Sequence, residues 1–521
     1  MLRKLCFMLV LSVWAGAACA EVRLAKIFTS DMLLQRDQPI RVWGWAAPQE
    51  AVTVILDGQK AATTADAQGK WLAELPARKQ GENLTLTITG QNSISLTNVI
   101  IGDVWLCAGQ SNMEWLLKDT DNAAEDSKAA DLPKIRRIKF NHVQSAFPEV
   151  EAPAATAWQV CTPRNAGGFS AVGFYFAREI QAQTGVPIGI LDDNWGGTPI
   201  EPWTPPAGME SVPELREAVT VRSNALAAYA VSLPRQLNAL ESWLVSARAA
   251  ASNAAALPPM PTVAPHPGAN GWCSMYHAMI HPLVRFPIKG ALWYQGESNG
   301  GEGETYYHKM RALVGGWRKV WNQGDFPFYF VQLASFQNAN DNPAGGDGWA
   351  KLREAQTRSL GMTNTGMAVI LDTVPLKSAG DIHPRNKSDV GQRLARWALN
   401  RDYGQKDLVV SGPLYKSMKV EGNKIRLSFD YVGSGLMVGA KEGRAPAAEV
   451  KDGTLKRFAI AGADRKWVWA EAVIDGQSVV VSSGAVPEPV AVRYAFSMNP
   501  DGANLYNREG LPASPFRTDN W

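Results

Sequence analysis

The sequence predicts an α/β protein in which a parallel sheet flanked by helices lies between two smaller β domains. Three observations support this prediction. The length of 521 residues suggests two to four domains, and a hydrophobic content of 46% is typical of a folded globular protein. In the middle of the chain, apolar runs alternate with amphipathic helical stretches. Both ends instead carry short segments in which polar and apolar residues alternate.

The two ends of the chain, residues 21–98 and 405–521, are each predicted to form a β-sandwich-like domain. Short strands of alternating polarity, separated by turn signals such as Asp57-Gly58, are typical of that architecture. The strands predicted on this basis are 40–45, 52–56, 84–88, 424–429, 477–481 and 491–496.

Residues 99–404 are predicted to form the parallel sheet and its helices. Because such sheets are buried on both faces, their strands are nearly continuous apolar runs. The runs that fit are 104–107, 187–191, 291–294, 328–333 and 367–371. The helical stretches between and after them are 170–184, 304–321, 349–360 and 387–400. A helical and Pro-rich insertion interrupts the pattern at about 205–268.

Residues 1–20 have the composition of a secretory signal peptide. A charged start precedes an apolar run at 5–14, and an A-x-A cleavage site follows at 18–20. We therefore expect an exported protein, periplasmic or secreted. Cys19 leaves a lipoprotein as an alternative, although Gly16 fits the lipoprotein box poorly. No later apolar run reaches the ~18 residues of a membrane span.

Charge and cysteine content exclude several classes of protein. With 52 Lys and Arg against 49 Asp and Glu, the net charge is +3 and no basic cluster stands out, so we expect no nucleic-acid partner. The mature chain keeps Cys107, Cys161 and Cys273, which allow at most one disulfide and leave its pairing open. The oligomeric state is not predicted.

Four loops around the expected sheet carry polar side chains in unusual density. Ligands bind at the carboxyl ends of the strands in open α/β sheets. The loops are 109–112, with a Ser before a helix; 192–198, with paired glycines; 295–299, with two side-chain amides; and 381–384, with an Asp and a His. Each alone has an ordinary explanation, such as a helix N-cap or a tight turn. Together they offer a nucleophile, oxyanion donors, a base and an orienting acid, the minimum set for acyl transfer.

The sequence around these loops resembles the sialate O-acetylesterases, a branch of the SGNH/GDSL hydrolases. The resemblance covers nearly the whole mature chain. It is carried by the blocks 103–114, 195–201, 293–299 and 381–384, and by flanking segments at 31–35, 43–45, 504–507 and 517–519. It implies an SGNH-type sheet and an esterase that removes acetyl groups from sugar hydroxyls without a metal or another cofactor.

The resemblance implies Ser111 as the nucleophile, His383 as the base and Asp381 as the acid that orients the base. The wider superfamily places this acid three residues before the His, whereas Asp381 lies only two before it. That spacing fits the sialate O-acetylesterase branch, and it leaves room for a Ser–His dyad assisted by a carbonyl oxygen.

The resemblance also implies an oxyanion hole and a set of residues around the substrate. The hole would combine the amides of Ser111 and Gly197 with a side chain of the third loop, Gln295 in preference to Asn299. The residues expected to contact substrate are Gln110, Asn112, Trp195 and Glu297.

Two rival sites are weaker. Ser298 lies in a G-x-S-x-G pattern, and Asp372 and His383 follow it in the chain order of α/β-hydrolases. The glycines just after Ser298 are, however, a poor start for the helix that this motif requires. His277 and His281 have helical spacing but lack the Glu of a metalloprotease motif, so no metal site is expected.

The sequence does not choose the substrate. O-acetylated sialic acid would require a cation for its carboxylate, with Arg164 and Arg385 as candidates. Acetylated xylan or another polysaccharide would instead favour an open groove lined by Trp195, Trp203 and Trp272. A secreted sugar-binding protein without activity is the alternative from another class, and the intact Ser, Asp and His argue against it.

Overall fold

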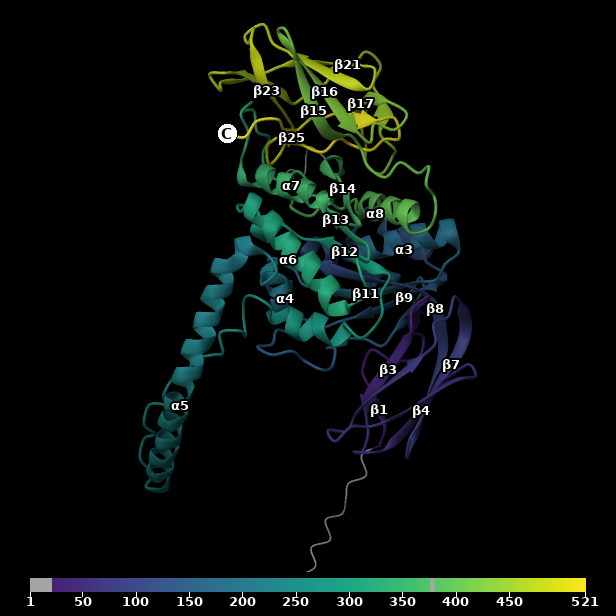
Figure 1. Ribbon diagram of the computed structural model, residues 1–521, viewed down its shortest axis with the longest axis vertical. Coiled ribbons are helices and arrows are strands. Elements are labelled where there is room, and N and C mark those ends of the chain that lie inside the picture. The colour runs from purple at the N-terminus through teal and green to yellow at the C-terminus, as the bar shows by residue number, and fades with distance from the viewer. Residues whose placement is uncertain (1–20, 375–379) are drawn as a thin grey trace, which may run out of the picture.

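The computed structural model describes residues 21–374 and 380–521, so the predicted signal peptide at 1–20 lies outside the described part. The described chain is a mixed α/β protein with a large central sheet and several antiparallel sheets. Figure 1 shows the N-terminal strands (purple) at one end, the helices and central sheet in the middle, and the C-terminal strands (yellow) at the other end. Within the described ranges, no helix is both long and apolar enough to cross a membrane.

The central sheet is parallel over most of its width. Its strands, in spatial order, are β10 (Gln159–Cys161), β9 (Leu132–Lys139), β11 (Ile188–Asn194), β8 (Ser93–Gly109), β12 (Gly290–Tyr294), β13 (Phe328–Val331) and β14 (Thr365–Ala368). Every neighbouring pair from β9 to β14 is parallel, and β10 adds an antiparallel edge. Strands β11 to β14 are buried at every residue, as expected of a sheet covered on both faces.

Helices cover both faces of this sheet. They are α3 (Ala171–Thr184) and α8 (Lys387–Arg401) on one face, and α6 (Glu304–Trp321) and α7 (Gly348–Arg358) on the other. Successive strand residues serve opposite faces, so Trp105 packs with α3 and α8 while Leu106 belongs to the core that contains α6 and α7. Local signals set the helix ends: Ser170 caps the start of α3, and Gly185 ends it with a φ of 71°.

The N-terminal strands fall into two sheets, one of which is continuous with the central sheet. The strands β2 (Leu33–Gln35), β4 (Ala51–Leu56), β5 (Gln59–Thr64) and β7 (Gly81–Thr89) join the central sheet. The strands β1 (Arg23–Leu24), β3 (Ile40–Trp45) and β6 (Lys70–Leu75) form a separate antiparallel sheet. Strand β8 pairs with β7 and β2 in its first part and with β11 and β12 in its last part. The expected boundary between 98 and 99 therefore falls inside β8. It marks the point where burial changes from alternating to complete along this 17-residue strand.

The C-terminal strands form three antiparallel sheets, in the orders β15-β16-β22-β21, β18-β17-β24 and β20-β19-β23-β25. Their bounds are β15 (Leu414–Glu421), β16 (Lys424–Asp430), β17 (Leu436–Ala440), β18 (Ala448–Glu449), β19 (Phe458–Gly462), β20 (Trp467–Trp469), β21 (Glu471–Asp475), β22 (Ser478–Ser482), β23 (Pro489–Tyr494), β24 (Leu505–Asn507) and β25 (Phe516–Arg517). Their buried side chains join those of the N-terminal strands and of α6 in one core.

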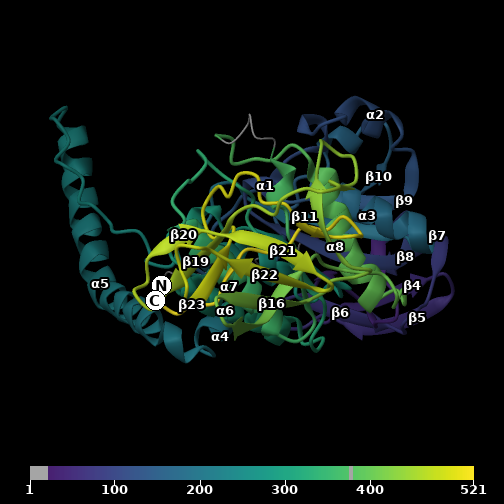
Figure 2. The ribbon, with the colours of Figure 1, turned by 90° about the horizontal axis from the view of Figure 1, so that it is seen from above.

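The segment between β11 and β12 contains a helix that projects from the body of the molecule, as Figures 1 and 2 show. This helix is α5 (Arg216–Ser252), and the short α4 (Pro206–Met209) precedes it. The Pro-rich chain then returns alongside α5, because the Trp243 indole donates to the Pro258 carbonyl and the Gln236 side chain accepts the Ala264 amide.

The three cysteines of the described chain, Cys107, Cys161 and Cys273, are buried free thiols. Burial raises the pKa of Cys161 and that of Cys273 to about 12. All three are free, so the disulfide that the sequence left open is absent among them. Because burial raises the pKa of each thiol, all three are protonated at neutral pH.

Candidate active site

Ser111 lies where β8 ends and the short helix α1 (Ser111–Glu114) begins. The turn depends on Gly109, whose φ of 139° side chains rarely adopt. A Cβ at Gly109 would also lie 2.2 Å from the Tyr294 carbonyl oxygen, so β8 and β12 approach closely only because this residue is glycine. Because Ser111 begins the helix, no helix carbonyl accepts its amide. Its hydroxyl and its amide both lie at the carboxyl edge of the sheet.

His383 reaches Ser111 from the segment before α8. Its Nε2 lies 2.9 Å from the Ser111 Oγ, which is a hydrogen-bond distance. The imidazole also stacks on the Trp115 indole, with ring centroids 5.0 Å apart. Burial lowers the pKa of His383, the Lys387 ammonium lowers it further, and Asp381 opposes the shift. A histidine in this setting is unprotonated at neutral pH and can accept the hydroxyl proton.

Asp381 holds the backbone of His383 more closely than it holds the ring. One carboxylate oxygen accepts the His383 amide at 2.8 Å, and the same oxygen lies 3.5 Å from Nδ1. The second distance is long for a hydrogen bond. The Asp381 side chain is also 47% exposed, so water competes for it. The structure thus brings the predicted Ser, His and Asp together, with Asp381 as the loosest of the three.

The glycine loop after β11 packs directly on Ser111. A Cβ at Gly196 would lie 3.3 Å from the Cβ of Ser111, and the Gly196 amide donates to the Glu114 carboxylate at 2.7 Å. Gly197 follows in open space with a φ of 74°. Within the described chain, neither the Ser111 amide nor the Gly197 amide donates to a protein acceptor. Two such amides beside a nucleophile can stabilise an oxyanion.

The third loop does not offer the side-chain donor that the resemblance implies. Gln295 is fully buried, and its Nε2 donates to Gln110 Oε1, to the Thr198 carbonyl and to Asn299 Oδ1. The Nδ2 of Asn299 donates to the carboxylates of Glu201 and Glu302. Both side-chain amides therefore tie this loop to the glycine loop, and neither has a hydrogen left for an oxyanion.

The four residues expected to contact substrate are placed differently from one another. Asn112 is fully buried and donates to the Glu297 carboxylate at 2.5 Å, so both point into the protein. Gln110 is also buried, but only its oxygen is engaged, as an acceptor from the third loop. Its Nε2 hydrogens have no protein acceptor in the described ranges. Trp195 is half-buried beside Gly196.

Three residues near Ser111 and His383 were not predicted from the sequence: Glu114, His142 and Lys387. His142 stacks on Trp195 with centroids 4.8 Å apart, and its Nε2 lies 2.9 Å from Glu114 Oε1. Lys387 is fully buried next to the site, and its Nζ donates a hydrogen bond to Asn112 Oδ1. Helical spacing could have revealed Glu114, three residues after the Ser, and Lys387, four after the His. No motif marks the stretch that contains His142.

The rival catalytic arrangement does not form. The structure gives the Ser298 hydroxyl no histidine partner among the described residues, and a glycine-rich stretch separates it from α6. Asp372 is ion-paired with Arg393 at 2.6 Å rather than with a histidine. His277 and His281 each direct Nδ1 at a backbone carbonyl.

The residues considered for a substrate groove differ in exposure. Trp203 is fully buried and makes an edge-to-face contact with Trp293, so it lines no groove. Trp272 is half-buried, whereas Arg164 and Arg385 are exposed. Of these residues, Arg385 lies nearest in sequence to His383.

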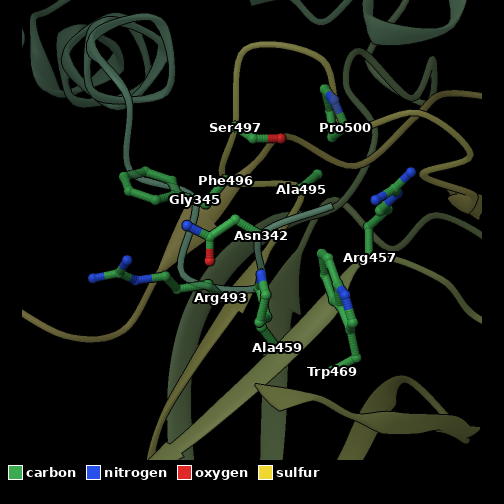
Figure 3. Close-up of a pocket in the computed structure, with 11 residues that line it drawn as sticks. Asn342, Gly345, Arg457, Ala459, Trp469, Arg493, Ala495, Phe496, Ser497 and Pro500 are labelled. Atoms are coloured by element: carbon green, nitrogen blue, oxygen red, sulfur yellow. The ribbon is translucent and has the colours of Figure 1, made fainter. Parts of the chain in front are cut away.

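A separate pocket lies between the loop around 342–345 and the C-terminal strands (Figure 3). Arg457, Trp469, Arg493 and Phe496 are among its lining residues. Arg493 is fully engaged there with Asp519 and with backbone carbonyls. The pocket shares no residue with the Ser111 site.

Comparison with known proteins shows the family to which the chain belongs. Residues 101–230 and 269–400 match the family described as carbohydrate esterase, sialic acid-specific acetylesterase. Both ranges together include Ser111 and His383. The matches place the chain among the carbohydrate esterases, and within that class it belongs to the sialic acid-specific acetylesterase family.

Individual relatives match along almost their whole length. The chain is 28% identical to the sialate O-acetylesterase of Rattus norvegicus, over 98% of this chain and 97% of the rat protein. The human sialate O-acetylesterase is 29% identical, with 98% and 95% covered. The crystal structure of a novel carbohydrate acetylesterase from Xanthomonas citri superposes with a TM-score of 0.77 at 38% identity, and covers 96% of this chain and 100% of that one.

Proposed function

We propose that the protein hydrolyses acetyl esters on sugar hydroxyls by a serine acyl-enzyme mechanism. The observation that carries this proposal is the 2.9 Å contact between His383 Nε2 and Ser111 Oγ at the carboxyl edge of the sheet. Membership of the esterase family supports the class of reaction. The SGNH-type hydrolase assignment for residues 99–404, with a β domain on either side, is part of the same proposal.

The first half of the reaction transfers the acetyl group to the enzyme. The Ser111 hydroxyl gives its proton to His383 Nε2 while Oγ attacks the acetyl carbonyl carbon, and the carbonyl electrons move to its oxygen. When this intermediate collapses, the bond between the acetyl carbon and the sugar oxygen breaks. His383 then donates its proton to that oxygen, so the sugar leaves as an alcohol and the acetyl group stays on Ser111.

The second half releases acetate. A water molecule gives a proton to His383 as its oxygen attacks the acetyl carbon, and collapse breaks the bond to Ser111 Oγ. The serine recovers its proton from His383. Asp381 stabilises the imidazolium in both halves, and its loose 3.5 Å contact makes its contribution smaller than that of a closely held carboxylate.

The oxyanion in both halves would be held by the amides of Ser111 and Gly197 and by Gln110 Nε2. Gln110 replaces the third-loop amides in this role because its Nε2 is the unused side-chain donor next to Ser111, whereas Gln295 and Asn299 are occupied. The Gln110 amide is oriented by three N–H groups that donate to its oxygen. Its Nε2 hydrogens have no protein acceptor in the described ranges and are available to a substrate oxygen.

The substrate class we propose is an O-acetylated sugar, with O-acetylated sialic acid as the first candidate. The names of the rat and human relatives support this choice, and the exposed Arg385 can pair with a sugar carboxylate. Acetylated xylan or another polysaccharide would use the same chemistry without that pairing. We also propose that residues 1–20 direct export to the periplasm or beyond, which N-terminal sequencing of the mature protein would test by finding Glu21 first.

Acetate release by the wild type and by Ser111→Ala, from O-acetylated sialic acid and from acetylated xylan, tests the function. The proposal expects release by the wild type and a loss of at least ~1000-fold in the variant. Arg385→Ala should raise KM for the sialate several-fold and leave xylan unchanged if sialate is the substrate. Binding of either glycan without any turnover would instead favour a binding protein.

A further inference from the structure

Lys387 is a fully buried lysine beneath the Ser111 site, and the mechanism above does not use it. It is the first residue of α8, four residues after His383, and its side chain reaches inward to Asn112 Oδ1. Its ammonium also lies 5.6 Å from the ring centroid of Trp115 and 5.3 Å from that of Tyr294. A lysine is almost never buried so completely unless its ammonium group is paired with another polar group.

The partner of this lysine joins three loops. Asn112, whose oxygen accepts from Lys387, donates through Nδ2 to the Ile382 carbonyl at 3.0 Å and to Glu297 Oε1 at 2.5 Å. Asn112 directly follows the nucleophile, and Ile382 directly precedes His383. One buried side-chain amide therefore fixes the chain next to the nucleophile against the chain next to the base, and Lys387 fixes that amide.

The lysine also reaches the base through an aromatic ring. The face of Trp115 stacks on His383 at 5.0 Å, and the Lys387 ammonium lies over the same indole. A buried cation beside two aromatic rings is attracted to the faces of both. The contact at Nζ is with Asn112 rather than with Ser111, so Lys387 does not take the place of His383 as the base.

The titratable groups that face Lys387 come from two segments, the loop after β12 and the segment before α8. Burial lowers the pKa of Lys387 to about 7, and Glu297 after β12 and Asp381 before α8 oppose that shift. Burial also raises the pKa of Glu297, whose Oε2 has no hydrogen-bond partner in the described structure. The remaining group is His383, which the ammonium disfavours in its charged form. Because the pKa of His383 lies below 6.5 and that of Lys387 is about 7, Lys387 is mostly charged in the pH range where His383 takes up its proton.

We propose that Lys387 is a positioning residue, which aligns Ser111 with His383 through Asn112 and whose positive charge keeps His383 unprotonated. This inference rests on the proposed serine mechanism. Loss of the side chain should loosen the 2.9 Å contact between base and nucleophile. Loss of the charge should let His383 protonate at a higher pH.

The test is the pH dependence of kcat/KM with an aryl acetate for the wild type, Lys387→Met and Lys387→Gln. Both variants should move the acidic limb toward higher pH by on the order of one unit. Lys387→Met should also lower kcat at the plateau by at least tenfold, whereas Lys387→Gln keeps a hydrogen-bond donor for Asn112 and should lose less. Circular dichroism and thermal unfolding show whether each variant is folded.

Lys309→Met is the matched control. Lys309 is also a buried lysine, but it is ion-paired with Glu201 and Glu302 on the other side of the third loop and does not touch His383. Its loss should lower the melting temperature without moving the limb. An unmoved limb in folded Lys387→Met and Lys387→Gln, or an equal shift in Lys309→Met, would overturn the inference. The serine mechanism itself fails only if Ser111→Ala stays active, so the two failures are distinguishable.

Discussion

The Glu114 carboxylate accepts the backbone amide of Gly196 at 2.7 Å. The short helix that begins with Ser111 therefore also holds the glycine loop that packs on the nucleophile. The other oxygen of Glu114 lies 2.9 Å from His142, which stacks on Trp195 in the same loop. This arrangement fixes the Gly197 amide relative to the Ser111 hydroxyl.

Replacing Glu114 should weaken transition-state binding more than substrate binding. Glu114→Ala removes a charge-assisted hydrogen bond of about 1.5–3 kcal/mol, so we expect kcat to fall by roughly 10- to 100-fold with a smaller change in KM. Glu114→Gln keeps an acceptor for the Gly196 amide and should retain most of the activity. Equal kcat values for Glu114→Ala and the wild type would contradict this role.

The donor assignment is tested by a pair of isosteric changes. Gln110→Glu keeps the oxygen that accepts from the third loop but replaces the Nε2 donor by a second oxygen, so kcat should fall by about 100-fold or more. Gln295→Glu changes a residue whose donors serve only the protein, and we expect it to lower the melting temperature more than it lowers kcat. Steady-state kinetics and thermal unfolding of both variants measure the difference. The reverse ranking of the kcat losses would return the role to Gln295.

The pH profile should reflect the lowered pKa of His383. A protonated imidazole cannot accept the Ser111 proton, so kcat/KM falls as the pH drops through the pKa of His383. Because that pKa is below its usual 6.5, the acidic limb should lie below pH 6.5. Asp381 raises the pKa, so Asp381→Asn should move the limb to still lower pH. An upward shift in this variant would contradict the placement of Asp381.

Gly109 should be irreplaceable for stability. Gly109→Ala places a Cβ 2.2 Å from the Tyr294 carbonyl oxygen at a φ of 139°, and we expect a loss of about 2–4 kcal/mol in the free energy of unfolding. Gly185→Ala is the control, since its φ of 71° is also left-handed but a Cβ there meets nothing within 4 Å. It should cost only about 1–2 kcal/mol. Urea unfolding of both variants gives the two values, and equal losses would show that the contact with Tyr294 matters little.

The sequence located the elements of the sheet because the signals were local. Residues 304–321 were predicted as a helix and form α6 with the same bounds, since its apolar stripe repeats at helical spacing. The strands β11 to β14 are recognisable as apolar runs because they are buried at every residue. Strand β8 was predicted only in part, because its first residues alternate in burial as an ordinary surface strand does and its last do not.

The sequence predicted that Ser111 and His383 would lie together, but it did not predict which side chains would be free to donate to an oxyanion. The Ser and His motifs are far apart in the sequence, and the carboxyl ends of the strands bring them to one edge of the sheet. Whether a side-chain amide faces substrate or protein depends on partners such as Thr198 and Glu201, which lie in another loop. Gln295 therefore has the expected residue type in the expected place, but its Nε2 hydrogen bonds go to protein acceptors. His142 carries no sequence signal, because only the fold places it on Trp195.

Covalent trapping shows whether Ser111 Oγ is the nucleophile. The purified protein would be treated with a fluorophosphonate, digested and analysed by peptide mass spectrometry. We expect one adduct, on the peptide that contains Ser111, and its loss in His383→Ala, because the imidazole activates that hydroxyl. An adduct on Ser298, or full esterase activity after complete modification of Ser111, would contradict it.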